Sequence, residues 1–346
     1  MQISEAATRA AMINPQLRDA GWKLADRTQV RFEVPVHAYD PTPWNGFTDY
    51  SLYDATSRVI AIIEAKKTAR DPREGEEQLR LHVEEVAHTQ ALPPFGFMAN
   101  GLRIFFWEPG VAHPREVAGF FSPDDLGRLD FFRRNRKPLS EAAINTAIVN
   151  RDYQHEAIRR VTEAFEAGRR RALLVMATGT GKTRTTMALI DLMRRSQWAQ
   201  NVLFVADRDP LVEQALTDGF KAHLPDEPRV RIATGKIDKT QRLYVATLQT
   251  MSRCYERFTP GFFDLVVFDE AHRLQPLQRS HRVLRRPHRR AHRDSRRLHR
   301  PEYVPDLPLR RPEADLPLHL RAGAEGRAPC TLPTAVLEHL LPARRH

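Results

Sequence analysis

Two carboxylates and a lysine in the amino-terminal third have residue types and a spacing that could support metal-dependent hydrolysis. The segment FTDYSLYDATSRVIAIIEAKKT contains Asp49, Glu64 and Lys66. Residues 59–63 are apolar at odd and even positions alike, which predicts a strand buried on both faces. Side chains two positions apart on a strand share a face, so Glu64 and Lys66 are expected to point the same way. Asp49, on the preceding strand, is then expected to meet Glu64 across a hairpin.

Two carboxylates that converge with an ammonium group can hold Mg²⁺ and position or activate water for phosphodiester cleavage. Asp49 and Glu64 are the candidate metal ligands. Lys66 would orient the nucleophile or stabilise the developing charge. A solvated hairpin rim is the alternative interpretation, because an Asp-x14-Glu-x-Lys spacing is common by chance. The nuclease interpretation therefore depends on the surrounding sequence.

A second motif with chemical meaning is RRALLVMATGTGKTRTTMALIDLM, in which a glycine-containing loop joins an apolar strand to a helix. Glycines let the backbone close around phosphate, and the amino terminus of the helix adds a favourable dipole. Lys182 is expected to reach the β- and γ-phosphates of ATP, and the Thr183 hydroxyl to ligate Mg²⁺. The predicted ATP-binding loop comprises Thr178, Gly179, Thr180, Gly181, Lys182 and Thr183.

Two further acidic residues end the apolar segment FFDLVVFDEAH, which predicts a strand. Asp269 is expected to hold Mg²⁺ through water, and Glu270 to polarise the water that attacks the nucleotide. Strands of this kind that alternate with helices indicate an α/β fold.

The segments SEAATR, TDYSLY, IEAKKT and EEQLR together resemble the PD-(D/E)xK nuclease domain of type I restriction endonuclease R subunits. The resemblance implies that Gln78 belongs to the site, in a Gln-x-x-x-Tyr pattern. His82 stands where the Tyr would be. Glu5 either approaches the same site or is an ordinary acidic residue in the first turn of a helix.

The glycine loop carries Met176 in place of the first Gly of the strict pattern and resembles the loop of superfamily 2 helicases. RDYQHEAI resembles the helicase Q motif, in which Gln154 would contact adenine. NVLFVADRDPLVEQA and RLYVATLQTM resemble motifs that contact DNA. The order of the domains, nuclease first and helicase motor second, is similar to that of the R subunit of type I restriction enzymes. This resemblance covers residues 1–273.

This resemblance implies ATP-dependent translocation of double-stranded DNA coupled to Mg²⁺-dependent double-strand cleavage, beside methyltransferase (M) and specificity (S) subunits. The expected organisation is a PD-(D/E)xK nuclease-like domain at 1–140 and a linker at 141–150. An incomplete RecA-like helicase domain follows at 151–273, and an irregular basic tail at 274–346.

The tail has an unusual composition. Its 73 residues contain no Lys, Ile, Phe, Met, Asn or Trp, and carry 16 of the 54 Lys and Arg but only 7 of the 43 Asp and Glu. Arg, Leu, Pro, His and Gln, whose codons begin wholly or partly with cytosine, make 48 of the 73 residues. We interpret this bias as a GC-rich gene read out of frame. A disordered basic arm that binds DNA is the alternative.

The net charge of +11 therefore belongs mainly to the tail. The resemblance implies a Ser/Thr-Ala-Thr strand between the phosphate-loop strand and the Asp269 strand, and the sequence offers no such motif after the acids. The sheet is thus expected to lack a central strand. A second motor domain, which would supply an Arg to the nucleotide, is also missing, so this chain is not expected to translocate DNA.

The remaining features predict a cytoplasmic protein. Cys254 and Cys330 form no CxxC or zinc pattern, and neither a signal-peptide layout nor an apolar run of about 18 residues is found. Two other functions stay open: a stand-alone superfamily 2 helicase, and a non-catalytic fragment that binds DNA or partner subunits. DNA-stimulated ATP hydrolysis without partners would indicate the helicase.

Overall fold

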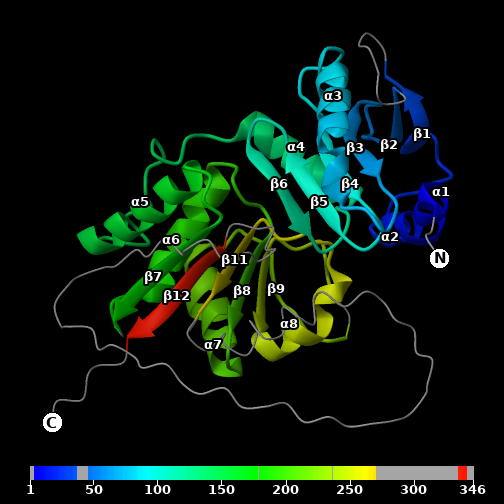
Figure 1. The fold of residues 1–346 in the computed structure, drawn as a ribbon. Helices are drawn as coiled ribbons and strands as arrows, with labels where there is room; N and C mark the ends of the chain where they lie inside the picture. Colours follow the sequence, from blue (N-terminus) through cyan, green and yellow to red (C-terminus); the bar gives the residue numbers. More distant parts are fainter. Residues whose placement is uncertain (1–3, 37–45, 178, 236, 270–333, 341–346) are drawn as a thin grey trace, which may run out of the picture.

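The computed structural model describes residues 4–36, 46–177, 179–235, 237–269 and 334–340. The protein is an α/β fold with two six-stranded sheets, which occupy the upper and lower parts of Figure 1. The first region, residues 4–135, contains strands β1 to β6 in sequential order. The second region, residues 137–269 with 334–340, contains the strand order β7-β12-β11-β8-β10-β9.

The first sheet is mixed. Its strands are β1 (Val30–Pro35), β2 (Phe47–Tyr53), β3 (Val59–Ala65), β4 (Phe95–Ala99), β5 (Ile104–Glu108) and β6 (Ala112–Val117). Neighbouring strands are antiparallel except β3 and β4, which are parallel. A parallel pair needs a crossover connection, and here η2 (Pro72–Gly75) and α3 (Glu76–Ala87) supply it. This crossover brings α3 over the strand that carries Glu64.

Short helices close the first region at both ends of its sequence. They are α1 (Glu5–Thr8), the π-helical turn η1 (Arg9–Ile13), α2 (Asn14–Asp19) and α4 (Pro123–Asn135). The Ser4 hydroxyl caps α1 by accepting from the Ala7 N–H, and Ser122 and Asp125 form a capping box on α4. The buried rings of Phe97, Phe106 and Phe121 pack together beneath the sheet.

The second sheet is entirely parallel. Its strands are β7 (Arg171–Ala177), β8 (Val202–Ala206), β9 (Arg229–Arg231), β10 (Leu243–Thr247), β11 (Leu265–Phe268) and β12 (Thr334–Leu340). Its helical segments are α5 (Asp152–Glu166), α6 (Lys182–Arg195), α7 (Asp209–Gln214), η3 (Ala215–Lys221), α8 (Leu248–Cys254) and η4 (Tyr255–Arg257). The central strands are apolar along their length, as expected for a sheet covered on both faces.

Strand β12 comes from the tail and lies between β7 and β11, where Figure 1 shows it in red. It pairs with β7 from Thr334 opposite Arg171 to Leu340 opposite Ala177, and with β11 on its other side. The prediction of a missing central strand was therefore wrong. It failed because no Ser/Thr-Ala-Thr motif marks residues 334–340. The irregular structure predicted for 274–333 and 341–346 lies outside the described residues.

The segment expected to be a linker packs on the second region. Ile148 and Val149 are buried in the same hydrophobic core as Ile158 of α5 and Leu189 of α6, and so is Leu139, which precedes the expected linker. The core of the second region therefore begins before residue 150, and the connection between the sheets is part of a packed layer.

The two regions are joined by a buried ion pair. The Arg128 guanidinium in α4 lies 2.9 Å (Nε) from Oδ1 of Asp264, the residue before β11. Its Nη2 also donates to the carbonyl oxygens of Gly261 and Phe262. The Asp264 Oδ2 accepts from the backbone N–H of Asn201 at the start of β8. The first region is thus attached where two strands of the second sheet begin.

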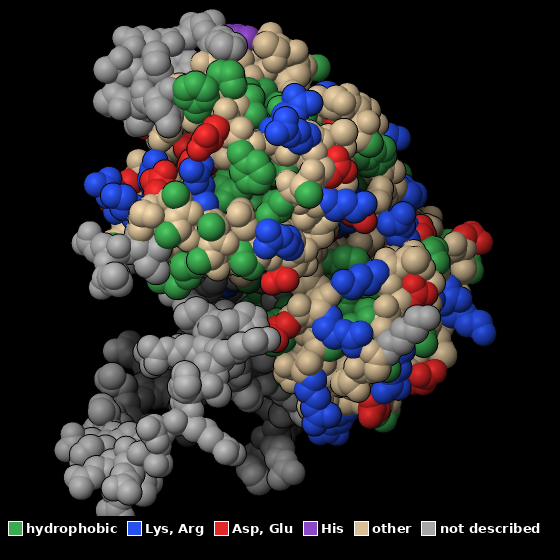
Figure 2. Space-filling view, turned by 90° about the vertical axis from the view of Figure 1, so that its right-hand side faces the viewer, with side chains coloured by type: hydrophobic (Ala, Val, Ile, Leu, Met, Phe, Trp, Pro, Cys, Tyr) green, Lys and Arg blue, Asp and Glu red, His purple; other side chains and the backbone are tan. Residues whose placement is uncertain are grey.

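Charged side chains are mixed over the surface. Figure 2 shows Lys and Arg side chains on both the upper and lower parts of one face, interspersed with acidic ones. This agrees with the near balance of 38 basic and 36 acidic residues over residues 1–273. Within the part of the chain that the structure describes, no helix is long and apolar enough to cross a membrane.

Candidate functional site

The hairpin formed by β2 and β3 brings Asp49 and Glu64 together as the sequence predicted. Tyr50 pairs with Ile63 in the antiparallel register, so Asp49 stands opposite Glu64. The Asp49 Oδ2 accepts a hydrogen bond of 2.7 Å from the Ala65 N–H. This bond ties the Asp49 side chain to the neighbouring strand and leaves Oδ1 to face other partners.

Glu64 is completely buried at the end of β3. Its Oε1 lies 2.6 Å from Nδ1 of His82 in α3. Its Oε2 accepts no hydrogen bond from an N–H or hydroxyl group of the described residues. A buried carboxylate oxygen without an N–H or hydroxyl donor is costly. The Glu64 carboxyl group shares a side-chain hydrogen bond with the Asp49 carboxyl group when it is protonated, and when it is ionised Oε2 is open to a cation.

Lys66 lies beside these carboxyl groups and is oriented by Gln78 of α3, whose Oε1 accepts a 2.9 Å hydrogen bond from Nζ. The close approach of Lys66 depends on Gly75, because a Cβ at that position would lie 2.9 Å from the Lys66 Cε. The structure thus brings Gln78 into contact with the predicted site, at the place where the family pattern puts it.

His82 contacts the carboxylate directly, which the sequence did not indicate. Burial, together with the nearby charge of Lys66, lowers the pKa of His82 to about 4. The ring is therefore neutral near pH 7. Its Nδ1 and Oε1 of Glu64 share one hydrogen bond, in which Nδ1–H donates when Glu64 is ionised and the carboxyl O–H donates when Glu64 is protonated. The Gln-x-x-x-His spacing was the available signal, since it places residues 78 and 82 one helical turn apart on one face.

The carboxyl groups have raised pKa values for a common reason. Burial raises the pKa of Glu64 well above its usual value, and the charge of Asp49 raises it further. Burial also raises the pKa of Asp49. Glu5 lies near enough that burial and the Asp49 charge raise its pKa as well. Buried carboxyl groups that disfavour each other's ionisation are typical of catalytic and cation-binding sites.

The donor set fits a hard divalent cation. Two carboxylates with an unsatisfied oxygen on Glu64 offer the oxygen ligands that Mg²⁺ prefers. No group of three or more His, Cys, Asp and Glu side chains that could hold a metal ion is found among the described residues. A cation here would therefore be bound by Asp49 and Glu64, with water and substrate oxygens completing its coordination.

The glycine loop after β7 has the expected backbone. Gly179 and Gly181 have φ values of +78° and +84°, a region that favours glycine, and α6 begins at Lys182. Gln154 and Tyr153 of α5 both contact the loop. Each donates a hydrogen bond to the Thr180 carbonyl oxygen, at 3.1 and 2.8 Å respectively. Thr178 lies outside the described residues.

The loop and Asp269 lie at one edge of the second sheet. In a parallel sheet the carboxyl ends of all strands meet at the same edge, where ligands bind in open α/β folds. Lys182 and Thr183 follow β7, and Asp269 follows β11 and donates its N–H to Val205 of β8 at 2.8 Å. Glu270 lies outside the described residues.

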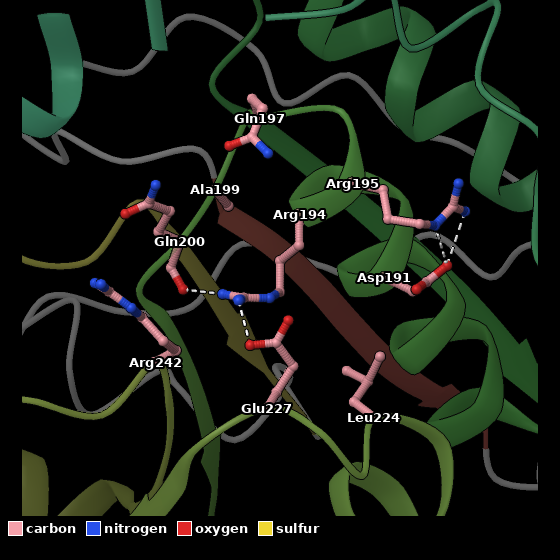
Figure 3. A pocket seen from close by; sticks show the side chains of 9 residues that line it. All are labelled: Asp191, Arg194, Arg195, Gln197, Ala199, Gln200, Leu224, Glu227 and Arg242. Carbon is pink, nitrogen blue, oxygen red and sulfur yellow. Dashed lines mark hydrogen bonds and ion pairs between the residues drawn. The ribbon is translucent and has the colours of Figure 1, made fainter. Parts of the chain in front are cut away.

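A cavity of about 360 Å³ lies at the opposite edge of the second sheet, beside the last turn of α6 (Figure 3). Its arginines are already engaged. Arg194 donates to the Gln200 carbonyl oxygen and to Glu227, and Arg195 forms a 2.8 Å ion pair with Asp191. Helix α6, of 14 residues, separates this cavity from the glycine loop by about 20 Å.

Comparison with known proteins gives the family to which the chain is similar. Residues 147–288 match the family described as the res subunit of type III restriction enzymes. The chain is 27% identical over 301 residues to the EcoAI endonuclease subunit of a type I restriction enzyme from Escherichia coli. It is 28% identical over 352 residues to the corresponding EcoKI subunit of Escherichia coli K12.

These alignments cover 78% and 79% of the chain but 36% and 29% of the relatives, so the chain spans about a third of their length. A solved structure described as a fragment of an HsdR subunit of a type I restriction enzyme from Vibrio vulnificus YJ016 is 23% identical. It covers 80% of this chain and 53% of that one, with a TM-score of 0.33. The sequence matches lead to one conclusion: the chain is a homologue of the endonuclease subunits of type I restriction enzymes.

Proposed function

We propose that the first region is a PD-(D/E)xK nuclease domain that cleaves double-stranded DNA with Mg²⁺. The observation that carries this proposal is the convergence of Asp49, Glu64 and Lys66 on adjacent strands, with Glu64 buried and one of its oxygens left without a donor. Both oxygens of Asp49 accept hydrogen bonds, from Arg9 and from the Ala65 N–H, whereas Oε2 of buried Glu64 accepts from no N–H or hydroxyl group of the described residues.

Each side chain has a distinct role in the proposed reaction. Asp49 and Glu64 would bind the cation, and His82 would fix the orientation of Glu64 through its Nδ1–H. Gln78 holds the Lys66 ammonium, which would bind a phosphate oxygen or the attacking water. A bound Mg²⁺ would supply Lewis-acid stabilisation of the phosphoryl oxygens and lower the pKa of a water ligand.

We further propose that the second region is a RecA-like helicase domain that binds ATP through the loop of residues 178–183. Support comes from the two positive φ values, the helix that starts at Lys182 and the all-parallel sheet. Lys182 would contact the β- and γ-phosphates, with Thr183 and Asp269 toward Mg²⁺. Glu270 would polarise water, and Gln154, which holds the loop, would contact adenine.

The longer relatives suggest the wider context. By analogy with them, we propose that the chain acts in the cytoplasm on DNA beside M and S subunits, and that ATP-driven translocation requires sequence beyond the described regions. Neither a stand-alone helicase nor a non-catalytic fragment is favoured, because neither explains the unsatisfied oxygen of Glu64.

The decisive experiment is cleavage of supercoiled plasmid DNA by the purified chain with Mg²⁺. We expect nicked and linear products from the native sequence, and none from Asp49→Asn. Asp54→Asn is the matched control, because Asp54 lies on the same hairpin but is bound by Arg58, 2.7 Å away. Equal cleavage by Asp49→Asn would overturn the nuclease proposal. DNA binding by the native chain without any cleavage would indicate a binding fragment instead.

The nucleotide proposal has a separate test. Binding of a fluorescent ATP analogue should be lost in Lys182→Ala and retained in Lys221→Ala, which changes a lysine at the end of η3. Undiminished binding by Lys182→Ala would remove the assignment of the loop. Since the loop and the carboxylates are in different regions, failure of one proposal leaves the other standing.

A further inference from the structure

Arg9 is the one cationic side chain from the amino-terminal helices that contacts Asp49 in the described structure. Its Nη1 lies 3.0 Å from Asp49 Oδ1, and its Nη2 lies 3.1 Å from Oε1 of Glu33. The Arg9 side chain is 21% exposed and that of Asp49 14%. The oxygen of Asp49 that the Ala65 N–H does not use is therefore occupied by a guanidinium.

The geometry around this bridge is unusual on both sides. Arg9 begins the π-helical turn η1, and π-helical turns are frequent at functional sites. Glu33 has a φ of +50° within β1, between the residue paired with Tyr50 and the residue paired with Thr48. This places Glu33 beside Asp49 at the cost of backbone strain. A strained glutamate and an irregular helix thus hold one arginine against a candidate metal ligand.

The positive charge of Arg9 opposes the binding of a divalent cation at Asp49. A cation bound to Asp49 would lie within a few ångströms of the guanidinium, where two positive charges repel strongly in a partly buried site. Lys66 adds another positive charge beside Glu64. Glu33 and Glu5 add negative charge at the rim. Glu33 is 67% exposed, however, so solvent screens its charge, while Asp49 and Arg9 are largely shielded.

We infer that Arg9 couples the binding of a divalent cation at Asp49 and Glu64 to the binding of DNA. Without DNA, Arg9 forms an ion pair with Asp49 and repels the cation. The carboxyl groups are then in position, but their affinity for the cation is low. A DNA phosphate brings negative charge to Arg9 and Lys66, and the cation then binds with its charge compensated. Arg9 is a positioning residue in this scheme, since it acts through Asp49. The inference rests on the proposed nuclease function.

Calorimetric titration of the full chain with Ca²⁺, with and without a short DNA duplex, tests this coupling without any cleavage step. For the native chain we expect weak Ca²⁺ binding that tightens when DNA is present. Arg9→Gln should bind Ca²⁺ at least about tenfold more tightly without DNA, and should gain much less from DNA. Arg9→Lys keeps the charge and should bind Ca²⁺ without DNA as the native chain does, within about twofold.

Arg58→Gln is the matched control. Arg58 also bridges two carboxylates, those of Asp54 and Asp130, each at 2.7 Å, and its side chain is 27% exposed. This substitution should leave the Ca²⁺ affinity unchanged even if it lowers stability. Circular dichroism and thermal melting of each variant establish that it is folded, and Arg9→Lys preserves a test if Arg9→Gln does not fold.

The outcomes separate the coupling from the nuclease proposal. If Arg9→Gln binds Ca²⁺ as weakly as the native chain, or more weakly, the coupling role is overturned and Arg9 serves only to orient Asp49. If Asp49→Asn binds Ca²⁺ as the native chain does and the native chain cuts no DNA, the proposed nuclease function itself is rejected. Cleavage by the native chain with unchanged Ca²⁺ affinity in Arg9→Gln would reject the coupling alone.

Discussion

Arg128 and Asp264 form an ion pair that is almost fully buried, with 8% and 3% of their side chains exposed, between two regions of the chain with separate sheets. Burial raises the pKa of Asp264, and the charge of Arg128 and the N–H donors at the start of β8 oppose that rise. The pair is worth little relative to apolar residues, but losing one partner leaves a buried charge uncompensated.

Arg128→Met should therefore destabilise the chain by about 3–5 kcal/mol, as removal of one partner of a buried pair does. Urea unfolding followed by circular dichroism measures the loss. Arg80→Gln is the control, because Arg80 pairs with Glu77 and Glu84 on the exposed face of α3, and little change is expected there. A similar effect of both substitutions would show that the buried ion pair between the two regions contributes no more to the free energy of unfolding than an exposed pair does.

His82→Phe should destabilise the first region by about 1–3 kcal/mol, because it leaves Oε1 of buried Glu64 without its hydrogen-bond partner. His82→Gln, which keeps an N–H donor, should recover part of the loss. His88→Phe, at the exposed end of the same helix, is the control. Thermal melting of the four proteins is the measurement, and equal melting of His82→Phe and the native chain would contradict the contact.

Gly181→Ala should impair the loop more than Gly179→Ala. Both glycines have positive φ, which costs an alanine about 1–2 kcal/mol. A Cβ at residue 181 would also lie 2.6 Å from Nε2 of Gln154, whereas a Cβ at residue 179 would meet no atom within 4 Å. Binding of a fluorescent ATP analogue should fall further in Gly181→Ala. The reverse order would mean that Gln154 does not hold the loop.

Asp130 gives a pH-dependent prediction. Burial alone would raise its pKa, but hydrogen bonds from Arg58 and Arg133 outweigh burial and lower it. A carboxyl group whose pKa is lower in the folded state contributes its full stabilisation of the fold at pH values above its unfolded-state pKa, which is about 4. This contribution is lost as the pH falls through its folded-state pKa.

Asp130→Asn should accordingly be less stable than the native chain at pH 7. The difference between the two should shrink as the pH falls below about 4. Urea unfolding midpoints from pH 7 to pH 2 measure this. A difference that stays constant with pH would show that Asp130 acts by packing alone. Asp26→Asn is a useful comparison, since the pKa of Asp26 is lowered by hydrogen bonds from Thr28 and no ion pair with arginine is found for it in the described structure.

Much of the geometry of the candidate sites could be predicted from local sequence patterns. The hairpin register that places Asp49 opposite Glu64 was predicted because strand periodicity fixes which side chains share a face. The turn at Gly179 and Gly181 was predicted because only glycine adopts such φ values readily. In both cases the interacting residues are near in sequence or follow a regular period.

Contacts between distant segments were not predictable in this way. Arg9 reaches Asp49 across 40 positions, and the arginine has no periodicity that distinguishes it from a surface residue. Strand β12 was missed for a related reason. Its apolar residues Ala335, Val336 and Leu337 lie in a segment rich in Arg, Pro and His, and the prediction of the central strand depended on a motif rather than on length and apolar content.

The position of β12 has a consequence for the order of folding during synthesis. Every strand of the first sheet lies within the first 117 residues, so that sheet can close while the rest of the chain is still being translated. The second sheet cannot close until residues 334–340 have been translated, because they form the strand between β7 and β11. Until then β7 and β11 present open edges that other strands can pair with. The nascent second region therefore passes through an interval in which chaperone binding competes with misassembly.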